Sequence, residues 1–335
     1  MKLGVTAILL VLLTAAAAAV SLLVGGTPLS VAQIATALAH PRDPGIVNAI
    51  VWQLRLPRVC VAATVGAALA LCGAMLQGML RNPLVDPYLT GVSAAAAAAI
   101  AIAILAGAAA GAMPAIGFVA GLGAAVLVAS LARRGGGIDS NRLILAGVSL
   151  STLFAAIVAL VVVRAQSSDY AATIVAWLAG SMAGRGWHEL AVAAPYLGVG
   201  ALLALWAAAP LNALRIGELR ARAVGVNVDR AQWIILAGSS LLAASSVVLA
   251  GLVGFVGLIV PHLARRLVGS DARVLLPACA AIGATLCMLA DAICRRIVAP
   301  AELPIGVLLA FIGVPTFLYL YLHSPPSLNS SARVD

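Results

Sequence analysis

Charge is scarce in this chain. Of its 335 residues only 9% are Asp, Glu, Lys or Arg, whereas 63% are hydrophobic. Soluble domains carry about 25% charged residues, and a globule in water could not bury so many apolar side chains, because much of its surface stays exposed. This composition excludes an ordinary soluble protein and indicates that lipid surrounds most of the chain.

Lysine is nearly absent, since Lys2 is the only one. A phosphate-binding loop of the form G-x-x-x-x-G-K-[ST] needs a lysine that reaches the phosphates of the nucleotide. The chain therefore has no such loop and cannot hydrolyse ATP in that way.

Motifs for metals and redox chemistry are also missing. None of the five cysteines forms C-x-x-C, and no H-E-x-x-H occurs. The histidines at 40, 188, 262 and 323 lie far apart in the sequence. We expect no catalytic residue, no metal site and no cofactor bound by this chain, and we expect His262 to be a hydrogen-bonded packing residue. A membrane-embedded enzyme would need a convergent set of such groups.

Ten apolar runs make up most of what is present. A membrane helix needs about 20 apolar residues, and the first run exceeds the roughly 7–15 residues of a signal-peptide core, which favours a retained span. The eighth run is short and contains Pro261, which predicts a half-span or broken helix. The predicted fold is an all-α polytopic membrane protein with about ten transmembrane helices, near residues 3–24, 57–80, 88–107, 112–132, 142–163, 189–209, 231–251, 257–267, 274–296 and 304–323.

The distribution of cations predicts the orientation. Ten crossings put both termini on one side, and if that side is cytoplasmic, thirteen of the twenty cations are inside, as the positive-inside rule requires. The net charge of +9 could also suit a nucleic acid, but small groups of cations between apolar runs are typical of a lipid partner. Four of the seven outer cations form two tight pairs, Arg55 with Arg58 and Arg295 with Arg296.

Ionisable residues inside spans usually mark a function, and only Asp291 is central to an apolar run. Arg295 follows four residues later, at the spacing of a helical ion pair. We therefore expect the pair to satisfy Asp291. Few charges within the membrane disfavour an ion-coupled secondary carrier, which stays the alternative, and favour an energy source outside this chain.

The longest inner loop, 210–233, begins at Pro210, which is expected to end the sixth span. Arg215, Glu218 and Arg222 have helical spacing there, and Gly225 provides a stop. A solvated loop with one helical turn is an alternative. The sharper interpretation is a short helix on the membrane surface that a cytoplasmic partner moves.

Several segments resemble the FecCD-type permeases, the membrane subunits of bacterial ABC importers for ferric siderophores, haem and vitamin B12. The resemblance covers about residues 1–323, expected to form one transmembrane permease domain, and leaves 324–335 as a disordered cytoplasmic tail. It is carried by "RLPR" (55–58), "RNPLVDPYLTGVS" (81–93), "GELRARAVGV" (217–226), "GFVGLIVPH" (254–262) and "AELPIG" (301–306).

The resemblance implies a set of partners in the bacterial inner membrane. These are a second permease subunit, most simply a second copy of this chain, two cytoplasmic ABC ATPases that use ATP and Mg²⁺, and a periplasmic binding protein. It implies that residues 215–226 are the coupling helices received by the ATPase, with Arg215, Glu218, Ala221, Arg222 and Gly225 in that motif.

The outer arginines acquire a role through the same resemblance. It implies that Arg55, Arg58 and Arg295 meet acidic residues of the binding protein, while the role of Arg296 stays open. Guanidinium groups form forked pairs with carboxylates, so such a rim would orient an acidic partner. The alternative is anchoring of helix ends by side chains that reach the interface.

The cargo is less well indicated. Tyr88 follows "DP", where haem-type members often have Gly, which favours a siderophore or vitamin B12. Small polar residues are expected along the pathway, and a short gate helix is expected within the outer loop 164–188. The candidate pathway residues are Ser149, Ser151, Thr152 and Ser167.

Overall fold

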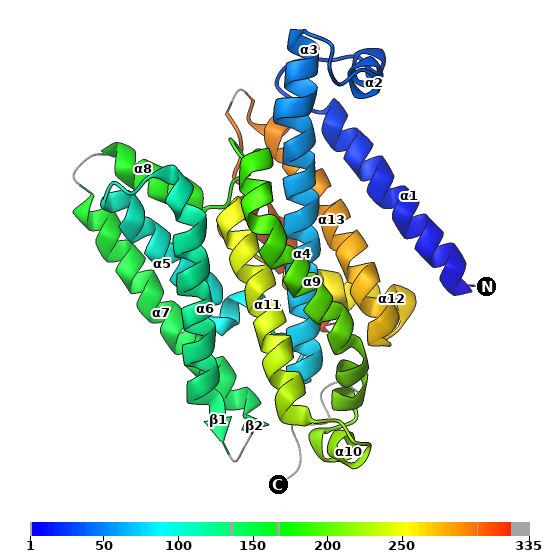
Figure 1. Ribbon diagram of the computed structural model, residues 1–335, viewed down its shortest axis with the longest axis vertical. Helices are drawn as coiled ribbons and strands as arrows, with labels where there is room; N and C mark the ends of the chain where they lie inside the picture. The colour runs from blue at the N-terminus through cyan, green and yellow to red at the C-terminus, as the bar shows by residue number, and fades with distance from the viewer. Residues whose placement is uncertain (1, 135–136, 166–167, 300, 323–335) are drawn as a thin grey trace.

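The computed structural model describes residues 2–134, 137–165, 168–299 and 301–322 (Figure 1). Helices account for almost all of it, and each of the ten predicted spans coincides with one, which confirms the all-α membrane fold. The main helices are α1 (Lys2–Leu23), α2 (Val31–Ala39), α3 (Ile46–Ala49), α4 (Leu56–Leu80), α5 (Val92–Leu105), α6 (Met113–Ala132), α7 (Ser140–Arg164), α8 (Ser168–Leu178), α9 (Trp187–Arg215), α10 (Glu218–Ala223), α11 (Val228–Ala250), α12 (Val256–Val268), α13 (Ala272–Ile297) and α14 (Ile305–Leu322).

Seven helical stretches in the described part of the chain are long and apolar enough to cross a membrane. One of them is continuous from Ile46 to Leu80, because α3 passes into α4 through the π-helical turn η1 (Ile50–Arg55). Helices α5, α12 and α14 are shorter. Between α6 and α7 the chain reverses through two short strands, β1 (Arg133–Arg134) and β2 (Gly137–Ile138).

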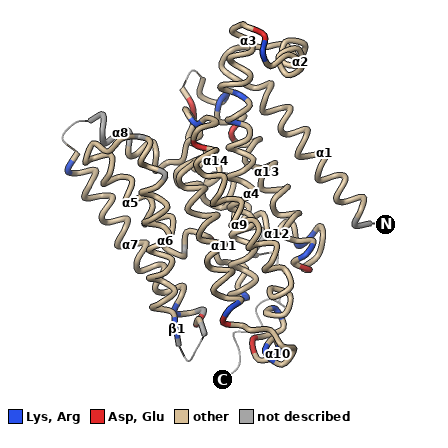
Figure 2. The backbone as a smooth tube through the Cα atoms, viewed as in Figure 1, with Lys and Arg blue, Asp and Glu red and all other residues tan. Residues whose placement is uncertain are grey.

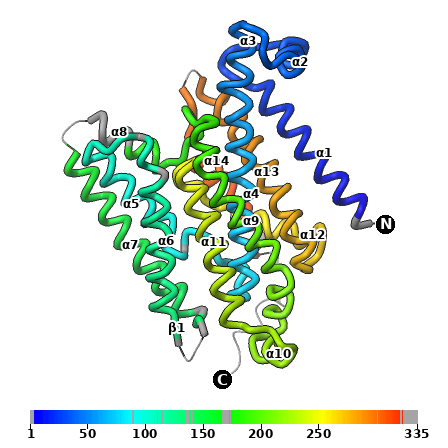
Figure 3. Tube along the Cα trace, viewed as in Figure 1, coloured from blue at the N-terminus to red at the C-terminus, as the bar shows by residue number. Residues whose placement is uncertain are grey.

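Helix α4 is the centre of the fold and packs against α9, α11, α12 and α13 (Figures 1 and 3). Helices α5 to α8 form a second group, which joins the centre mainly through α11. Helix α1 runs along the other side against α13, and large apolar side chains along it are exposed, as expected of a helix that faces lipid.

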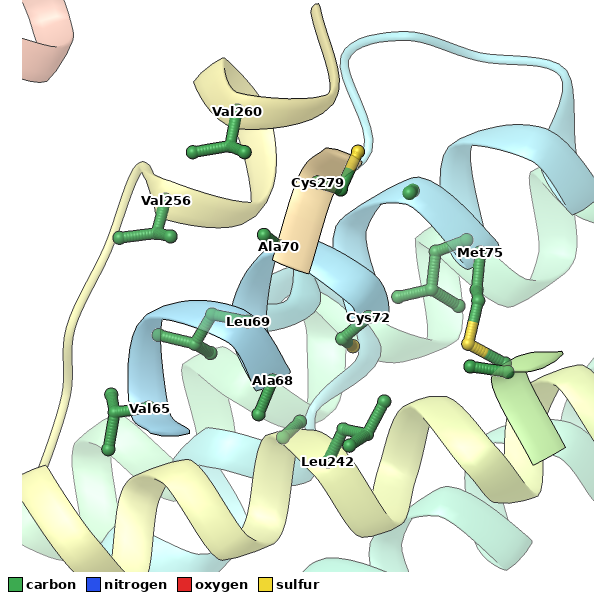
Figure 4. Packing of buried hydrophobic residues seen from close by; sticks show 14 of the residues in the cluster. Val65, Ala68, Leu69, Ala70, Cys72, Met75, Leu242, Val256, Val260 and Cys279 are labelled. Atoms are coloured by element: carbon green, nitrogen blue, oxygen red, sulfur yellow. The ribbon is translucent and has the colours of Figure 1, made fainter. Parts of the chain in front are cut away.

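Small residues let the backbones of α4 and its neighbours nearly touch. A Cβ added at Gly66 would lie 2.1 Å from the carbonyl oxygen of Gly283 in α13, and one at Gly73 would lie 1.9 Å from that of Gly257 in α12. Figure 4 shows buried side chains of α4, from Val65 to Met75, packed among those of α11, α12 and α13. Apolar surface gives helices little drive to associate in lipid, so this close packing supplies the attraction.

The eighth run forms the short helix α12, of 13 residues, which confirms the predicted half-span and continues through Pro261. An irregular segment separates it from α11. Residues 251–255 are irregular, with Phe255 in the left-handed region at φ 67°. Backbone at membrane depth survives only where protein shields it, and here Val253 and Val256 are buried. The main-chain N–H of Ser181 also donates to the carbonyl of Ala250 at 2.9 Å.

Two predicted boundaries were wrong. Helix α9 does not end at Pro210 but continues to Arg215, and it also contains Pro195. A proline removes one main-chain hydrogen bond, and membrane helices tolerate this loss because neighbouring groups satisfy the freed carbonyl. The third span begins at Val92 rather than Tyr88, because the 3₁₀ turn η2 (Pro87–Thr90) precedes it.

Charged residues lie at or near the ends of the helices, and the stretches between them are almost free of charge (Figure 2). One end carries α10 and the turn between α12 and α13. The other carries Arg58 and the start of α14. We call them the α10 end and the Arg58 end.

The close approach of α4 and α13 makes a prediction. In Gly66→Ala the new methyl group would overlap the carbonyl of Gly283, and overpacking of this kind costs about 1–3 kcal/mol. We expect a lower midpoint when the purified chain is unfolded by SDS in mixed micelles. Gly123→Ala in α6 is the matched control, because no atom lies within 4 Å of its Cβ position. Equal midpoints for the two variants would contradict the packing argument.

Candidate functional site

At the Arg58 end, two helices meet through a buried cluster of charges. Nη2 of Arg58 lies 2.8 Å from Oδ1 of Asp291, and the same guanidinium donates two hydrogen bonds of 2.9 Å to Glu302. Asp291 is 1% exposed. The expected pair with Arg295 is confirmed, at 3.1 Å. One carboxylate in the membrane therefore holds two arginines from different helices.

Arg295 reaches beyond this pair to the end of α1. Its Nη2 donates to the main-chain carbonyl of Ser21 at 2.9 Å and to its hydroxyl at 2.8 Å, and its Nη1 donates to the carbonyl of Val24. The last carbonyls of a helix have no partner within it. Arg295 supplies that partner and is 7% exposed.

Arg55 binds the same helix end from α4. Its Nη1 donates to the carbonyls of Leu22 and Leu23 at 2.7 and 3.1 Å, and its Nη2 donates to that of Thr27. It is 5% exposed. Arg55 and Arg295 thus fasten α1 to the rest of the protein, a task that no sequence motif indicates. Their predicted docking role stays a prediction.

A cavity of about 330 Å³ opens beside these residues. Arg185, on the loop after α8, is half-buried in its wall, and the Nε of Arg185 is buried without a hydrogen-bond partner. Burial lowers the pKa of Arg185, and Glu189 partly opposes this. Arg296, the outer arginine to which the sequence assigned no role, is exposed. The cavity is lined by Arg55, Arg58, Arg185, Arg295 and Glu302, among others.

At the opposite end the predicted coupling segment forms a short helix, α10. It covers only Glu218–Ala223, because Arg215 is the last residue of α9 and Gly225 follows the helix with φ 85°. The predicted helix over 215–226 is thus too long. Ala221 is fully buried, and Arg222 pairs with Asp229 at 2.9 Å on the surface.

Sequence reasoning missed the residue that holds α10 in place. The side chain of Gln232 in α11 is 2% exposed. Its Oε1 accepts from the main-chain N–H of Ile138 at 3.0 Å, and its Nε2 donates to Glu218 at 3.2 Å. One buried amide therefore joins α10 to the turn between α6 and α7. In the sequence, the one indication of this role was the position of Gln232 at the start of an apolar run.

A second, larger cavity of about 740 Å³ is almost entirely apolar. The residues around it come from η2, the end of α8, the break before α12 and α14. Asp86 is the one acidic residue among those that line it, and its Oδ1 accepts from the N–H of Tyr88 at 2.9 Å. An apolar cavity with one polar group is typical of a site for a small molecule.

Of the candidate pathway residues, the three that the structure describes do not line this cavity. Ser149 and Thr152 are exposed on α7, and Ser167 lies outside the described residues. Ser151 comes nearest, because its hydroxyl donates to the carbonyl of Tyr88 at 3.2 Å. Their role in transport stays a prediction.

Helix α8 lies within the loop where a short gate helix was expected. Three glycines allow the main chains around it to pack closely. A Cβ added at Gly180 or Gly306 would lie 2.5 Å from a main-chain oxygen, and one at Gly251 would lie 2.1 Å from the carbonyl oxygen of Trp177. The N–H of Ile305 donates to the carbonyl of Gly180 at 3.0 Å. The end of α8, the end of α11 and the start of α14 are therefore one packed unit beside the apolar cavity.

Residues 10–323 match the sequence model of the FecCD transport family. The chain belongs to this family. It is 40% identical over 307 residues to the cobalamin import system permease BtuC of Halobacterium salinarum, covering 90% of this chain and 81% of the relative. It is 37% identical to the Fe(3+) dicitrate permease FecC of Escherichia coli, covering 88% and 89%. Other relatives are named for hemin and for molybdate.

A solved structure supports the same family and the same fold. It is described as an inward-facing conformation of an ABC transporter of the metal-chelate type, with a TM-score of 0.85 and 35% identity. The match covers 94% of this chain and 98% of the other. Chains of this family are permease subunits of ABC transporters, so this chain is an integral membrane protein.

The cluster around Asp291 makes a prediction. In Asp291→Asn, Arg58 loses its buried carboxylate and Arg295 its ion pair, and loss of one partner in a buried pair costs about 3–5 kcal/mol. We expect a large drop in stability toward SDS. Glu302→Gln is the control: its side chain is 38% exposed, and such pairs contribute about 1 kcal/mol or less. Similar losses in the two variants would contradict a central role for Asp291.

Proposed function

We propose that this chain is the permease subunit of a bacterial ABC importer for an iron chelate, such as a ferric siderophore or haem, or for vitamin B12. The observation that carries the proposal is family membership over residues 10–323 in a chain whose sequence has no lysine beyond Lys2 for a phosphate-binding loop. The energy for uptake then comes from two cytoplasmic ATPases, which use ATP and Mg²⁺.

The apolar cavity supports assembly with a second copy of this chain. It is open to the outside of the monomer, and next to it α14 exposes Phe311, Ile312 and Leu318, by 76%, 46% and 51%. In a homodimer these faces would enclose a central path. Cargo would enter from the binding protein, pass this cavity and leave at the α10 end by alternating access.

The orientation follows from the cations. The α10 end carries Arg215, Arg220, Arg222 and Arg230, which suits the cytoplasmic side of the inner membrane. Both chain termini would then be cytoplasmic, with 324–335 as a tail. The Arg58 end would face the periplasm, where Arg55, Arg58 and Arg295 form the proposed docking rim. The basic cavity there supports an acidic partner.

Coupling would run through the buried amide of Gln232. The ATPase would displace α10, and Glu218 would transmit the displacement through Gln232 to the turn between α6 and α7. Helix α8 would act as the gate near the outer end of the path, because it is packed with α14 and the break before α12.

The decisive test is uptake into proteoliposomes that contain the full chain. We expect labelled cargo to accumulate only with the ATPase, the binding protein and ATP, and not with a proton or sodium gradient alone. Because the proposed rim guides docking, Arg58→Lys, which keeps a positive charge beside Asp291 but cannot form a forked pair with a carboxylate, should weaken the stimulation of ATPase activity by the binding protein and leave basal hydrolysis. Accumulation driven by an ion gradient without the ATPase would establish the secondary carrier instead.

A second test addresses the proposed coupling through the side chain of Gln232. Gln232→Met keeps the size of the side chain but removes both hydrogen bonds, each worth about 1 kcal/mol. We expect a rise of up to about thirtyfold in ATP hydrolysed per cargo molecule imported, and Glu218→Ala together with Gly225→Val should act in the same direction. Arg273→Gln, an exposed change at the same end, should leave the ratio unchanged. An unaltered ratio in Gln232→Met would refute the linkage.

A further inference from the structure

A basic cavity at the α10 end has no part in the proposed transport path. Its volume is about 500 Å³, and it lies between the last turns of α4, α9 and α12 and the first turn of α13. No acidic residue is among the described residues that line it. The charged or titratable side chains in its wall are Arg81, Arg215, His262, Arg265 and Arg266.

The four arginines lack carboxylate partners among the described residues, where each ion pair involves other groups. Arg265 donates to Oε1 of Gln77 at 2.8 Å, and Arg215 donates to the main-chain carbonyl of Ser270. These neutral acceptors leave the charges uncompensated. A concave site that gathers several guanidinium groups attracts an anion strongly.

Asp271, which lies between Ser270 and Ala272 of the wall, is already engaged. Asp271, at the start of α13, accepts from Nδ2 of Asn212 at 2.7 Å and from the N–H of Arg273 at 3.0 Å. The amide of Asn212, then the N–H of Arg273, lower the pKa of Asp271 and keep it ionised. It interacts with the charge of Arg215 but does not line the cavity. An anion from outside the chain would balance the arginines that line it.

His262 lines the cavity beside Arg265 and Arg266 of α12. The expectation that it is hydrogen-bonded was wrong for one nitrogen, because its Nε2 is buried and has no partner. Buried polar atoms nearly always have one. Because this nitrogen has almost no accessible surface, the arginines are the groups that a ligand in the cavity can reach.

The other part of the lining is apolar. Leu211, Leu275 and Leu276 contribute to the wall, and Leu263 and Leu267 lie exposed on the same helix as the arginines, by 36% and 60%. The cavity lies where membrane helices end, which is the level of the lipid phosphates. Guanidinium groups at that level with leucines beside them match a phosphate group that continues into acyl chains.

We propose that this cavity binds a phosphate ester, and that its source is the headgroup of an anionic phospholipid. Guanidinium groups bind phosphate oxygens in forked pairs, so the arginines of the wall would hold the phosphate. The lipid acyl chains would lie against Leu263 and Leu267. This inference is independent of the transported cargo.

The test measures lipid binding directly. Native mass spectrometry of the full chain in detergent would count molecules of phosphatidylglycerol or phosphatidylcholine bound as the lipid is titrated. Arg81→Asn together with Arg266→Gln removes two charges from the wall, and Asn suits the left-handed backbone at position 81 (φ 51°). We expect phosphatidylglycerol affinity to fall about 25-fold, from about fivefold for each arginine. If the double variant does not fold, Arg266→Gln alone should give about fivefold.

The controls separate this site from general attraction. Arg230→Gln with Arg273→Gln removes two exposed charges of the same end that do not line the cavity, and we expect less than a twofold change. Displacement of the lipid by inorganic phosphate at millimolar concentration would support a phosphate-binding site. It would overturn the lipid headgroup as the ligand and indicate a soluble phosphate instead. Equal losses in both double variants, or equal binding of the two lipids, would overturn the proposal. So would loss of phosphatidylglycerol binding when the ATPase is added, since the cavity would then be a protein interface.

Discussion

The contact of α4 with the backbones of α13 and α12 is the constraint on which the other features depend. Gly66 against Gly283 and Gly73 against Gly257 bring main chains so close that no side chain fits between them. In lipid this proximity replaces the hydrophobic effect as a source of attraction. It also brings the amide of Gln77 within 3.0 Å of the carbonyl of Gly257, so that a polar side chain can stabilise the broken region from within α4.

The polar chemistry of the protein is therefore confined to the helix ends, and each end is organised differently. At the Arg58 end, Arg55, Arg58 and Arg295 are satisfied by carboxylates and main-chain carbonyls, and they join α1, α4 and α13. At the α10 end, four arginines face a cavity without acidic partners. An end whose helices are joined in this way suits orientation of a partner, and an end with uncompensated charge suits binding of an anion.

Much of the fold could be predicted from the sequence, because lipid makes apolar length nearly sufficient to locate a helix. The ion pair of Asp291 with Arg295 followed from helical spacing. Interactions that involve main-chain atoms were out of reach, because carbonyls have no signature in a sequence: the acceptors of Arg55 are of this kind. The continuation of α9 through Pro210 depends on neighbouring groups that only the fold reveals.

The fastening of α1 has a consequence for biogenesis. Helix α1 leaves the ribosome before α4 and α13, yet one of its two anchors is Arg55 and the other is Arg295, which is synthesised about 240 residues later. At roughly 5–20 residues per second, α1 remains in the bilayer for about 10–50 s before Arg295 can bond the carbonyls of Ser21 and Val24. During that interval Arg55 is the one of the two anchors in place, so α1 is inserted well before its attachment is complete.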